Sequence, residues 1–253
     1  MQTRYYQSYT DDFVTSRNQS YQLPDNYVWL HKNILYRAAA RCFYLVGVIF
    51  SFCYCSFYLH IKVKNRSVLK KCRETGFFLY GNHTQPLGDA FIPARLLFPG
   101  RAFIVVGPAN LGIPILGRLL PMLGALPIAP SLTGMKKLRQ AVQRRIEDGN
   151  CVVIYPEAHV WPWYTGIRPF SPVSFSHPVN YAVPAVCMTA TYQKRKFGRK
   201  PQMTIYLDGP FYPDPTRTKK AQKEQLRRQI FRRMTTRSQN SNYEYIRYEK
   251  GGS

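Results

Sequence analysis

Acidic side chains are scarce in this sequence: 13 Asp and Glu residues stand against 36 Lys and Arg residues among 253 positions, for a formal net charge of +23. Such a charge predicts an anionic partner, either a nucleic acid or an anionic membrane surface, and composition alone does not choose between them. Because an unpaired buried carboxylate is costly, acidic residues beside apolar sequence are expected to have partners. Between positions 89 and 207, Asp89 and Glu157 are the two carboxylates in such sequence.

Paired cysteine motifs are also missing. The six cysteines show no paired metal-ligand spacing, and several lie in or beside apolar runs, which predicts reduced thiols packed as small hydrophobic groups. Such thiols fit a cytosolic chain better than a disulfide-stapled secreted one, and the polar N-terminus has no signal-peptide pattern. The apolar fraction of 45% excludes a disordered chain, and the length predicts one large domain with a substantial core.

Composition divides the chain into four segments. Residues 1–26 form a polar N-terminal arm, expected to be poorly ordered or draped on the surface. Residues 27–72 form a membrane-associated helical segment and residues 73–215 an α/β domain. Residues 216–253 form a basic C-terminal helix and tail.

Residues 42–59 are almost wholly apolar or aromatic. Their number is at the lower edge of the ~17–25 residues that span a bilayer. Basic residues flank both ends, so the distribution of positive charge indicates no orientation. The segment is predicted to be embedded in the membrane, either spanning it or lying in one leaflet. A buried core helix is the alternative, which the lack of a polar face disfavours.

Strand-like and helix-like runs alternate after Cys72, which predicts an α/β fold with a mixed, largely parallel sheet flanked by helices and preceded by the N-terminal membrane-embedded helix. The clearest helix covers residues 135–148, with Ser131 or Thr133 as its N-cap and Gly149 at its end. The predicted strands are residues 77–80, 102–107, 125–129, 151–155, 182–191 and 203–207.

A second, basic helix is predicted for residues 219–237, with Leu226, Ile230 and Met234 on one stripe. The simpler interpretation is that this stripe docks on the domain and the charged face is solvated. Contact with a membrane surface is the alternative. It would use Arg227, Arg228, Arg232 and Arg233.

Two predicted strands end in polar residues with catalytic potential. His83 follows the strand at 77–80, and Asp89 comes shortly after it, which pairs a general base with a carboxylate that can orient it. Glu157 follows the strand at 151–155. Strand ends that each deliver one functional group are how open α/β sheets build active sites. Pro86 is expected to start a helix that Thr84 or Gln85 caps.

These motifs resemble the glycerolipid acyltransferase family, which includes the lysophosphatidic acid acyltransferases. The resemblance covers about residues 76–186, and the apolar helix before it is in keeping. Each motif is weak alone, but the set occurs in the family's order. The motifs are Asn82-His83, Asp89, Tyr155-Pro156-Glu157 and Val183-Pro184.

The resemblance implies that residues 73–215 are an acyltransferase domain in which His83 is the general base and Asp89 orients it. An acceptor hydroxyl of glycerol-phosphate or a lysophospholipid then attacks the thioester of acyl-CoA or acyl-ACP directly. Neither an acyl-enzyme, a bound cofactor nor a metal is expected, and backbone amides near Pro86 are candidates to stabilise the oxyanion. Glu157 corresponds to the acceptor-binding motif. The implied setting is an anionic membrane surface, on the cytoplasmic face.

The sequence departs from the family pattern at three places. Five residues separate His83 from Asp89 instead of four, which turns Asp89 away from the imidazole unless Gly88 lets the loop absorb the extra residue. Pro130 stands where the family has an Arg that grips the acceptor phosphate; Lys136, Lys137 or Arg168 are the candidate substitutes. The family's Pro-Glu-Gly-Thr is replaced by the sequence from Pro156 to His159, with Ala158 in place of glycine.

Other function classes stay open beside the acyltransferase hypothesis. A basic module that binds nucleic acid or membrane would explain the charge, but no RNA-binding signature is present, so no nucleic-acid partner is expected. An inactive acyltransferase fold is also compatible with the extra residue. A metalloenzyme is a further alternative, although the sequence lacks the His-Glu-x-x-His pattern of many zinc sites. Its ligands would be His83, Asp89, His159 and His177.

Overall fold

The protein is described here by a computed structural model that covers residues 2–14, 20–72 and 74–251. Its centre is a sheet of seven strands in the order β2-β8-β7-β3-β6-β4-β5. The strands from β7 to β5 are parallel to one another, β8 is antiparallel to β7, and β2 is parallel to β8. The predicted mixed, largely parallel α/β sheet is confirmed. The strands are β2 (Lys62–Lys64), β3 (Phe77–Gly81), β4 (Ala102–Val106), β5 (Ala125–Pro127), β6 (Cys151–Ile154), β7 (Ala185–Gln193) and β8 (Gln202–Phe211).

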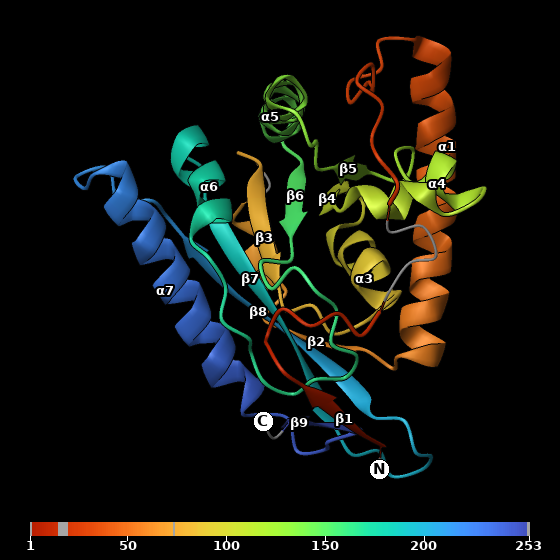
Figure 1. Cartoon of the computed structure of the whole chain (residues 1–253), viewed down its shortest axis with the longest axis vertical. Coiled ribbons are helices and arrows are strands. Elements are labelled where there is room, and N and C mark those ends of the chain that lie inside the picture. The colour runs from red at the N-terminus through yellow and green to blue at the C-terminus, as the bar shows by residue number, and fades with distance from the viewer. Residues whose placement is uncertain (1, 15–19, 73, 252–253) are drawn as a thin grey trace.

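Helices cover both faces of this sheet, which explains why its inner strands are apolar without alternation. Along β3 and β6, successive side chains enter two different cores. Phe78 and Val152 pack with α5–α7, whereas Leu79 and Val153 pack with α2, α3 and residues 55–61. Figure 1 shows α6 and α7 on one side of the strands and α1 and α3 on the other. The helices of the domain are α2 (Ser67–Lys70), α3 (Gly88–Leu97), α4 (Leu116–Leu119), α5 (Leu132–Glu147), α6 (Ser176–Tyr181) and α7 (Lys219–Ser238), with 3-10 turns at Pro108–Gly112 and Val173–Phe175.

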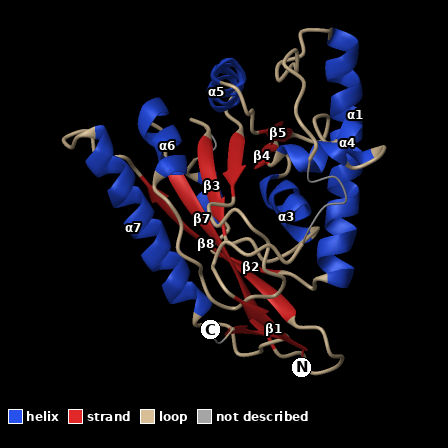
Figure 2. Cartoon of the chain, viewed as in Figure 1, coloured by secondary structure: helices blue, strands red, loops and turns tan. Residues whose placement is uncertain are grey.

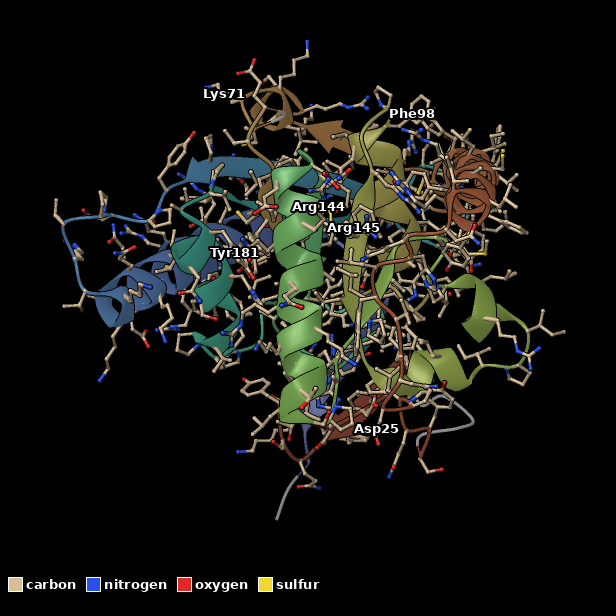
Figure 3. All side chains as sticks on the ribbon, turned by 90° about the horizontal axis from the view of Figure 1, so that it is seen from above. Asp25, Lys71, Phe98, Arg144, Arg145 and Tyr181 are labelled. Carbon is tan, nitrogen blue, oxygen red and sulfur yellow. The ribbon has the colours of Figure 1, made fainter. Side chains whose placement is uncertain are left out.

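Helix α5 begins and ends at polar signals present in the sequence. The Ser131 hydroxyl accepts the backbone N–H of Gly134 as the N-cap, and Gly149 follows the helix with a φ of +74°. Figure 3 shows α5 lying lengthwise. Arg144 and Arg145, in its last turn, lie nearer to Lys71 and Phe98, which come shortly before β3 and β4 in the chain and so mark the edge where these strands begin. The start of α5 therefore lies toward the other edge, where the parallel strands end.

The apolar segment forms α1 (Ile34–Cys53), which continues as a π-helix over Tyr54–Tyr58. The helix begins later than position 27 because Asn33 caps it, with its side chain accepting the N–H groups of Leu35 and Tyr36. By length and composition, Ile34–Tyr58 is long and apolar enough to cross a membrane, and only 28% of its most apolar stretch is buried. One stripe packs toward α3. The other faces expose large apolar side chains, including Val46, Ile49, Phe50 and Phe57.

The two ends of the chain pair with each other outside the main sheet. Strand β1 (Gln2–Tyr6) lies parallel to β9 (Ile246–Lys250). Figure 2 shows this small sheet at the bottom of the molecule, beside both chain ends. The preceding helix α7 docks through the expected stripe, because Leu226, Ile230 and Met234 are fully buried.

Candidate active site

The candidate site lies where β3 and β6 end. These strands are parallel neighbours, so the turns that follow them meet at the same edge of the sheet. His83 follows β3 by two residues, and Glu157 follows β6 by three. We call residues 82–88 the β3 turn and residues 155–168 the β6 loop.

His83 and Asp89 form a hydrogen-bonded pair. The distance from His83 Nδ1 to Asp89 Oδ2 is 2.7 Å, and the side chains are 20% and 4% exposed. Because a carboxylate only accepts hydrogen bonds, the imidazole carries its proton on Nδ1 and keeps the lone pair on Nε2. The pair thus presents a partly exposed imidazole whose Nδ1 is committed to the carboxylate.

The extra residue between these two side chains is absorbed by the β3 turn. Helix α3 begins at Gly88 rather than at Pro86, so the expected helix start is corrected by two residues, and neither Thr84 nor Gln85 caps it. Asp89 instead holds the turn: its Oδ2 also accepts the N–H of Gln85 at 2.9 Å. Gly88 contributes space, since a Cβ there would lie 2.9 Å from Gln85 Cβ and 3.0 Å from Leu59 Cδ1.

Strand β7 anchors the other side of the β3 turn. The side-chain amide of Asn82 pairs with the backbone of Ala190 through two hydrogen bonds, of 2.8 and 3.1 Å. This extends the β3–β7 ladder by one residue through a side chain. The buried hydroxyl of Tyr192 contacts Thr84 Oγ1 at 2.6 Å and accepts from Gln85 Nε2 at 3.1 Å. His83 is therefore flanked by residues fixed to a central strand.

Tyr155 backs the imidazole. Its ring stacks on His83 with the centroids 4.6 Å apart, and its hydroxyl donates to the backbone carbonyl of Asp89 at 2.6 Å. Burial raises the pKa of Tyr155 well above its ordinary value, and the nearby Asp89 carboxylate adds to that rise. Tyr155 therefore stays neutral and keeps donating to α3.

Glu157 and Arg168 form a buried ion pair, each side chain 1% exposed, with Oε2 and Nη2 3.0 Å apart. Glu157 also accepts the backbone N–H of His83 at 3.0 Å and that of Arg168 at 2.9 Å. The Arg168 guanidinium also donates hydrogen bonds to the backbone carbonyls of Tyr9 and His159. The structure thus places the Glu157 carboxylate against the backbone of His83 and pairs the charge of Arg168 with Glu157.

The rest of the β6 loop runs alongside the β3 turn. The N–H groups of Trp161 and Trp163 donate to the carbonyls of His83 and Thr84 at 3.0 and 2.9 Å. To reach this position the loop turns at Ala158, which has a φ of +65°. That is the left-handed conformation that glycine adopts without strain, so the turn persists although the glycine of the family pattern is replaced.

An N-terminal arm, here residues 2–14, covers the outside of the β6 loop. Trp161 is fully buried, and its indole N–H donates to the Asp11 carbonyl at 2.9 Å. Aromatic rings from both chain ends, and one from the loop itself, surround this indole. They are Tyr6, Tyr9, Phe13, Tyr164 and Tyr248. The arm that the sequence predicted to be poorly ordered or draped on the surface therefore packs on this loop and shields it from solvent.

The remaining predicted residues lie apart from the dyad. Lys136 and Lys137 are exposed on the first turns of α5, which follows β5. That strand is three positions from β3 in the sheet, about 14 Å at the usual strand spacing. His159 lies 3.7 Å from Asp12, and His177 stacks on Phe78. Within the described ranges, no three His, Cys, Asp or Glu side chains gather to hold a metal ion.

The sequence motifs contain Asn82 and Tyr155 but assign neither of them a role, and they do not include Tyr192 or the N-terminal arm. Tyr192 and the arm contact the site from 107 to 150 positions away in the chain, and no local pattern marks them.

Comparisons with known proteins identify the family and the fold of the chain. A protein-family model described as Acyltransferase matches residues 60–190, just over half of the chain. Among solved structures, the crystal structure of the 1-acyl-sn-glycerophosphate (LPA) acyltransferase PlsC from Thermotoga maritima is similar, with a TM-score of 0.57 and 11% identity. The match covers 85% of this chain and 87% of that one, and at this identity it shows the fold. No curated protein matches the chain.

Proposed function

Because the chain belongs to the acyltransferase family, with the resemblance drawn from its motifs thereby confirmed, we propose that it moves a fatty acyl group from acyl-CoA or acyl-ACP to a hydroxyl of glycerol-phosphate or a lysophospholipid. The observation that carries the proposal is the 2.7 Å contact between His83 Nδ1 and Asp89 Oδ2 at the end of β3. It supplies a base of defined tautomer where the family motif calls for one.

In the proposed reaction, Nε2 of His83 takes the proton of the acceptor hydroxyl while its oxygen attacks the thioester carbonyl. Asp89 stabilises the resulting imidazolium. The tetrahedral intermediate then collapses, the carbon–sulfur bond breaks, and the imidazolium returns the proton to the leaving thiolate. The ester and the free thiol are the products, and no acyl-enzyme is formed.

Backbone N–H groups at the start of α3 are the oxyanion donors of this proposal. Pro86 has no N–H, and those of Gln85, Asp89 and Ala90 already have acceptors. Among the hydrogen bonds of the described residues, none uses the N–H of Leu87 or of Gly88. Helix starts leave such donors free, and here they lie next to the dyad.

The acceptor side is built differently from the family pattern, and this bears on acceptor choice. Arg168 is bonded to Glu157, so the proposal assigns Glu157 and Arg168 to holding the backbone of His83. Lys136 and Lys137, exposed on α5, are the cations left to attract an acceptor phosphate from a distance. We therefore expect a phosphate on the acceptor to lower the KM for the acceptor by a smaller factor than in an enzyme whose arginine contacts that phosphate directly.

Membrane association is part of the same proposal. The exposed apolar face of α1 and the net charge of +23 support contact with an anionic bilayer, on the cytoplasmic face in the proposed setting. Such contact would deliver a lysolipid acceptor to the dyad without transfer through water.

Acyl transfer by detergent-purified protein tests the proposal. Radiolabelled acyl-CoA and acyl-ACP are offered with glycerol-phosphate, lysophosphatidic acid and neutral lysolipids, beside His83→Ala. General-base assistance is worth about 10²–10⁴-fold, so His83→Ala should lower transfer by that factor. Full activity in His83→Ala would contradict the mechanism, and no transfer by the unsubstituted protein to any acceptor would contradict the function.

A further inference from the structure

The loop between β7 and β8 concentrates positive charge on an exposed tip. We call residues 194–200 the basic hairpin; five of its seven residues are Lys or Arg. Phe197 at its tip is 73% exposed, and Gly198 has a φ of +87° with nothing within 4 Å of the position of a Cβ. In the described part of the chain, no ion pair neutralises any of these five cations. The charge of the hairpin therefore faces outward.

This hairpin is bound to the end of the apolar helix. Lys200 Nζ donates to the hydroxyl of Tyr58 at 2.8 Å and lies 3.9 Å from the centroid of its ring. Gln202 donates to the carbonyl of His60 at 3.4 Å. Figure 1 shows the hairpin projecting just beyond the end of α1. Phe57, which is 78% exposed, adds a second aromatic side chain to the same end.

The hairpin stands apart from the dyad. Gly81 at the end of β3 pairs with Met188, and β7 continues to Gln193. The hairpin begins at Lys194, six residues past Met188, which is about 20 Å beyond the end of β3 at the usual rise per residue. A hollow of about 330 Å³ lies at its base. The lining residues are His60, Lys194, Arg195, Lys196, Phe197 and Gln202.

We propose that the basic hairpin binds the phosphate headgroups of anionic membrane phospholipids, outside the acyl-transfer site. Lys and Arg attract anionic headgroups, while exposed Phe and Tyr side chains sit at the level where headgroups meet acyl chains. Both kinds of group are combined here at the end of an apolar helix. The hollow gives room for a phosphodiester between three cationic side chains. Bound lipid would hold this end of the sheet against the bilayer.

Binding of the full chain to phosphatidylcholine vesicles, with and without phosphatidylserine, tests this proposal. The variant K194Q/R195Q/K196Q removes three charges from the hollow. The variant K219Q/K220Q/K223Q removes three charges where α7 begins, two of them exposed and one partly buried, on the opposite side of Figure 1. Each cation near an anionic surface strengthens binding about fivefold, so the hairpin variant should bind phosphatidylserine vesicles about a hundredfold more weakly. The α7 variant should bind nearly as the unsubstituted chain does.

Three results would overturn the proposal. The first is equal loss of vesicle binding in the two variants. The second is loss of RNA binding by the hairpin variant while its vesicle binding is kept, which would make the hairpin a nucleic-acid surface. The third is a raised KM for acyl-CoA in detergent with vesicle binding unchanged, which would make the hollow part of the donor site. Acyl transfer in detergent should be equal in both variants, so failure of the proposed enzymatic function is read separately from failure of lipid binding.

Discussion

The two turns of the candidate site differ in what holds them. In the β3 turn, local hydrogen bonds from His83 and Gln85 to Asp89 are combined with contacts to the central strand β7. The β6 loop is held by the two ends of the chain, with the N-terminal arm and β9 packed around Trp161. The two parts of the site therefore have different roles. The β3 turn brings together the reactive groups, which are close in sequence, whereas the β6 loop beside it is packed against segments from the two chain ends.

Asp89→Asn is the sharpest way to break the β3 turn as a catalytic unit. The amide oxygen of asparagine can still accept the N–H of Gln85, so the turn should keep its shape, but the imidazolium loses its counter-charge. Acyl transfer is expected to fall by about 10²–10⁴-fold, measured as kcat with a saturating acceptor. Thermal unfolding serves as the control and should shift little. Activity within tenfold of the unsubstituted protein would mean that Asp89 is not the orienting group.

Breaking the Glu157–Arg168 pair should instead affect the fold. Removing one partner leaves a buried charge, so Glu157→Gln and Arg168→Met are each expected to lower the free energy of unfolding by about 3–5 kcal/mol in urea titrations. The double variant leaves no unpaired charge and should lose less than the sum. Arg144→Met, at the exposed pair with Asp148, is the matched control and should cost less than about 1 kcal/mol. Additive losses would show that the pair is not coupled.

His177 lies in α6, outside both turns, so its titration tests the acid sensitivity of the fold separately from catalysis. Burial, with a smaller contribution from Arg139, lowers the pKa of His177 from 6.5 to about 4. A depressed folded-state pKa adds stability that is fully present above pH 6.5 and is lost as the pH falls toward 4, because the unfolded chain binds the proton first. The loss amounts to roughly 3 kcal/mol.

His177→Phe should therefore remove part of the fall in unfolding free energy between pH 7 and pH 4, compared by urea titration at both values. The carboxylates that titrate in this range are the same in both proteins, so the difference reports on His177. Acyl transfer at pH 7 should be unchanged. Identical pH dependence of the two proteins would contradict the assignment.

The same contrast between local and distant contacts explains what the sequence predicted. The six expected strands are all present, and the clearest of them, β3 and β6, are buried on both faces and form uninterrupted apolar runs. Strands β1, β2 and β9 were not predicted: Lys62–Lys64 and the terminal strands are short, polar and defined by their partners. Patterns report burial along one segment, and they carry little information about pairing between segments.

In the site, the motif identified His83 and Asp89, and the extra residue between them made their predicted contact depend on Gly88. The contact forms because α3 starts two residues later than Pro86 and because Gly88 leaves room for Gln85 and Leu59. Neither a helix start nor a close approach of this kind can be read from residue spacing. The partners of Glu157 were likewise left open, since Arg168 lies eleven residues along a loop without periodicity.

Ala158→Gly is the mildest test of the β6 loop. The φ of +65° strains alanine by about 1 kcal/mol, and the greater freedom of glycine in the unfolded chain cancels part of the gain. The free energy of unfolding should rise by about 0.5 kcal/mol. Ala182→Gly, at a φ of +51° after α6, is the matched control outside the site. If both variants gain stability and keep their kcat, the turn at Ala158 only shapes the backbone. If Ala158→Gly alone lowers kcat, the strained alanine restrains the loop that holds His83, and the β6 loop takes part in catalysis through its rigidity.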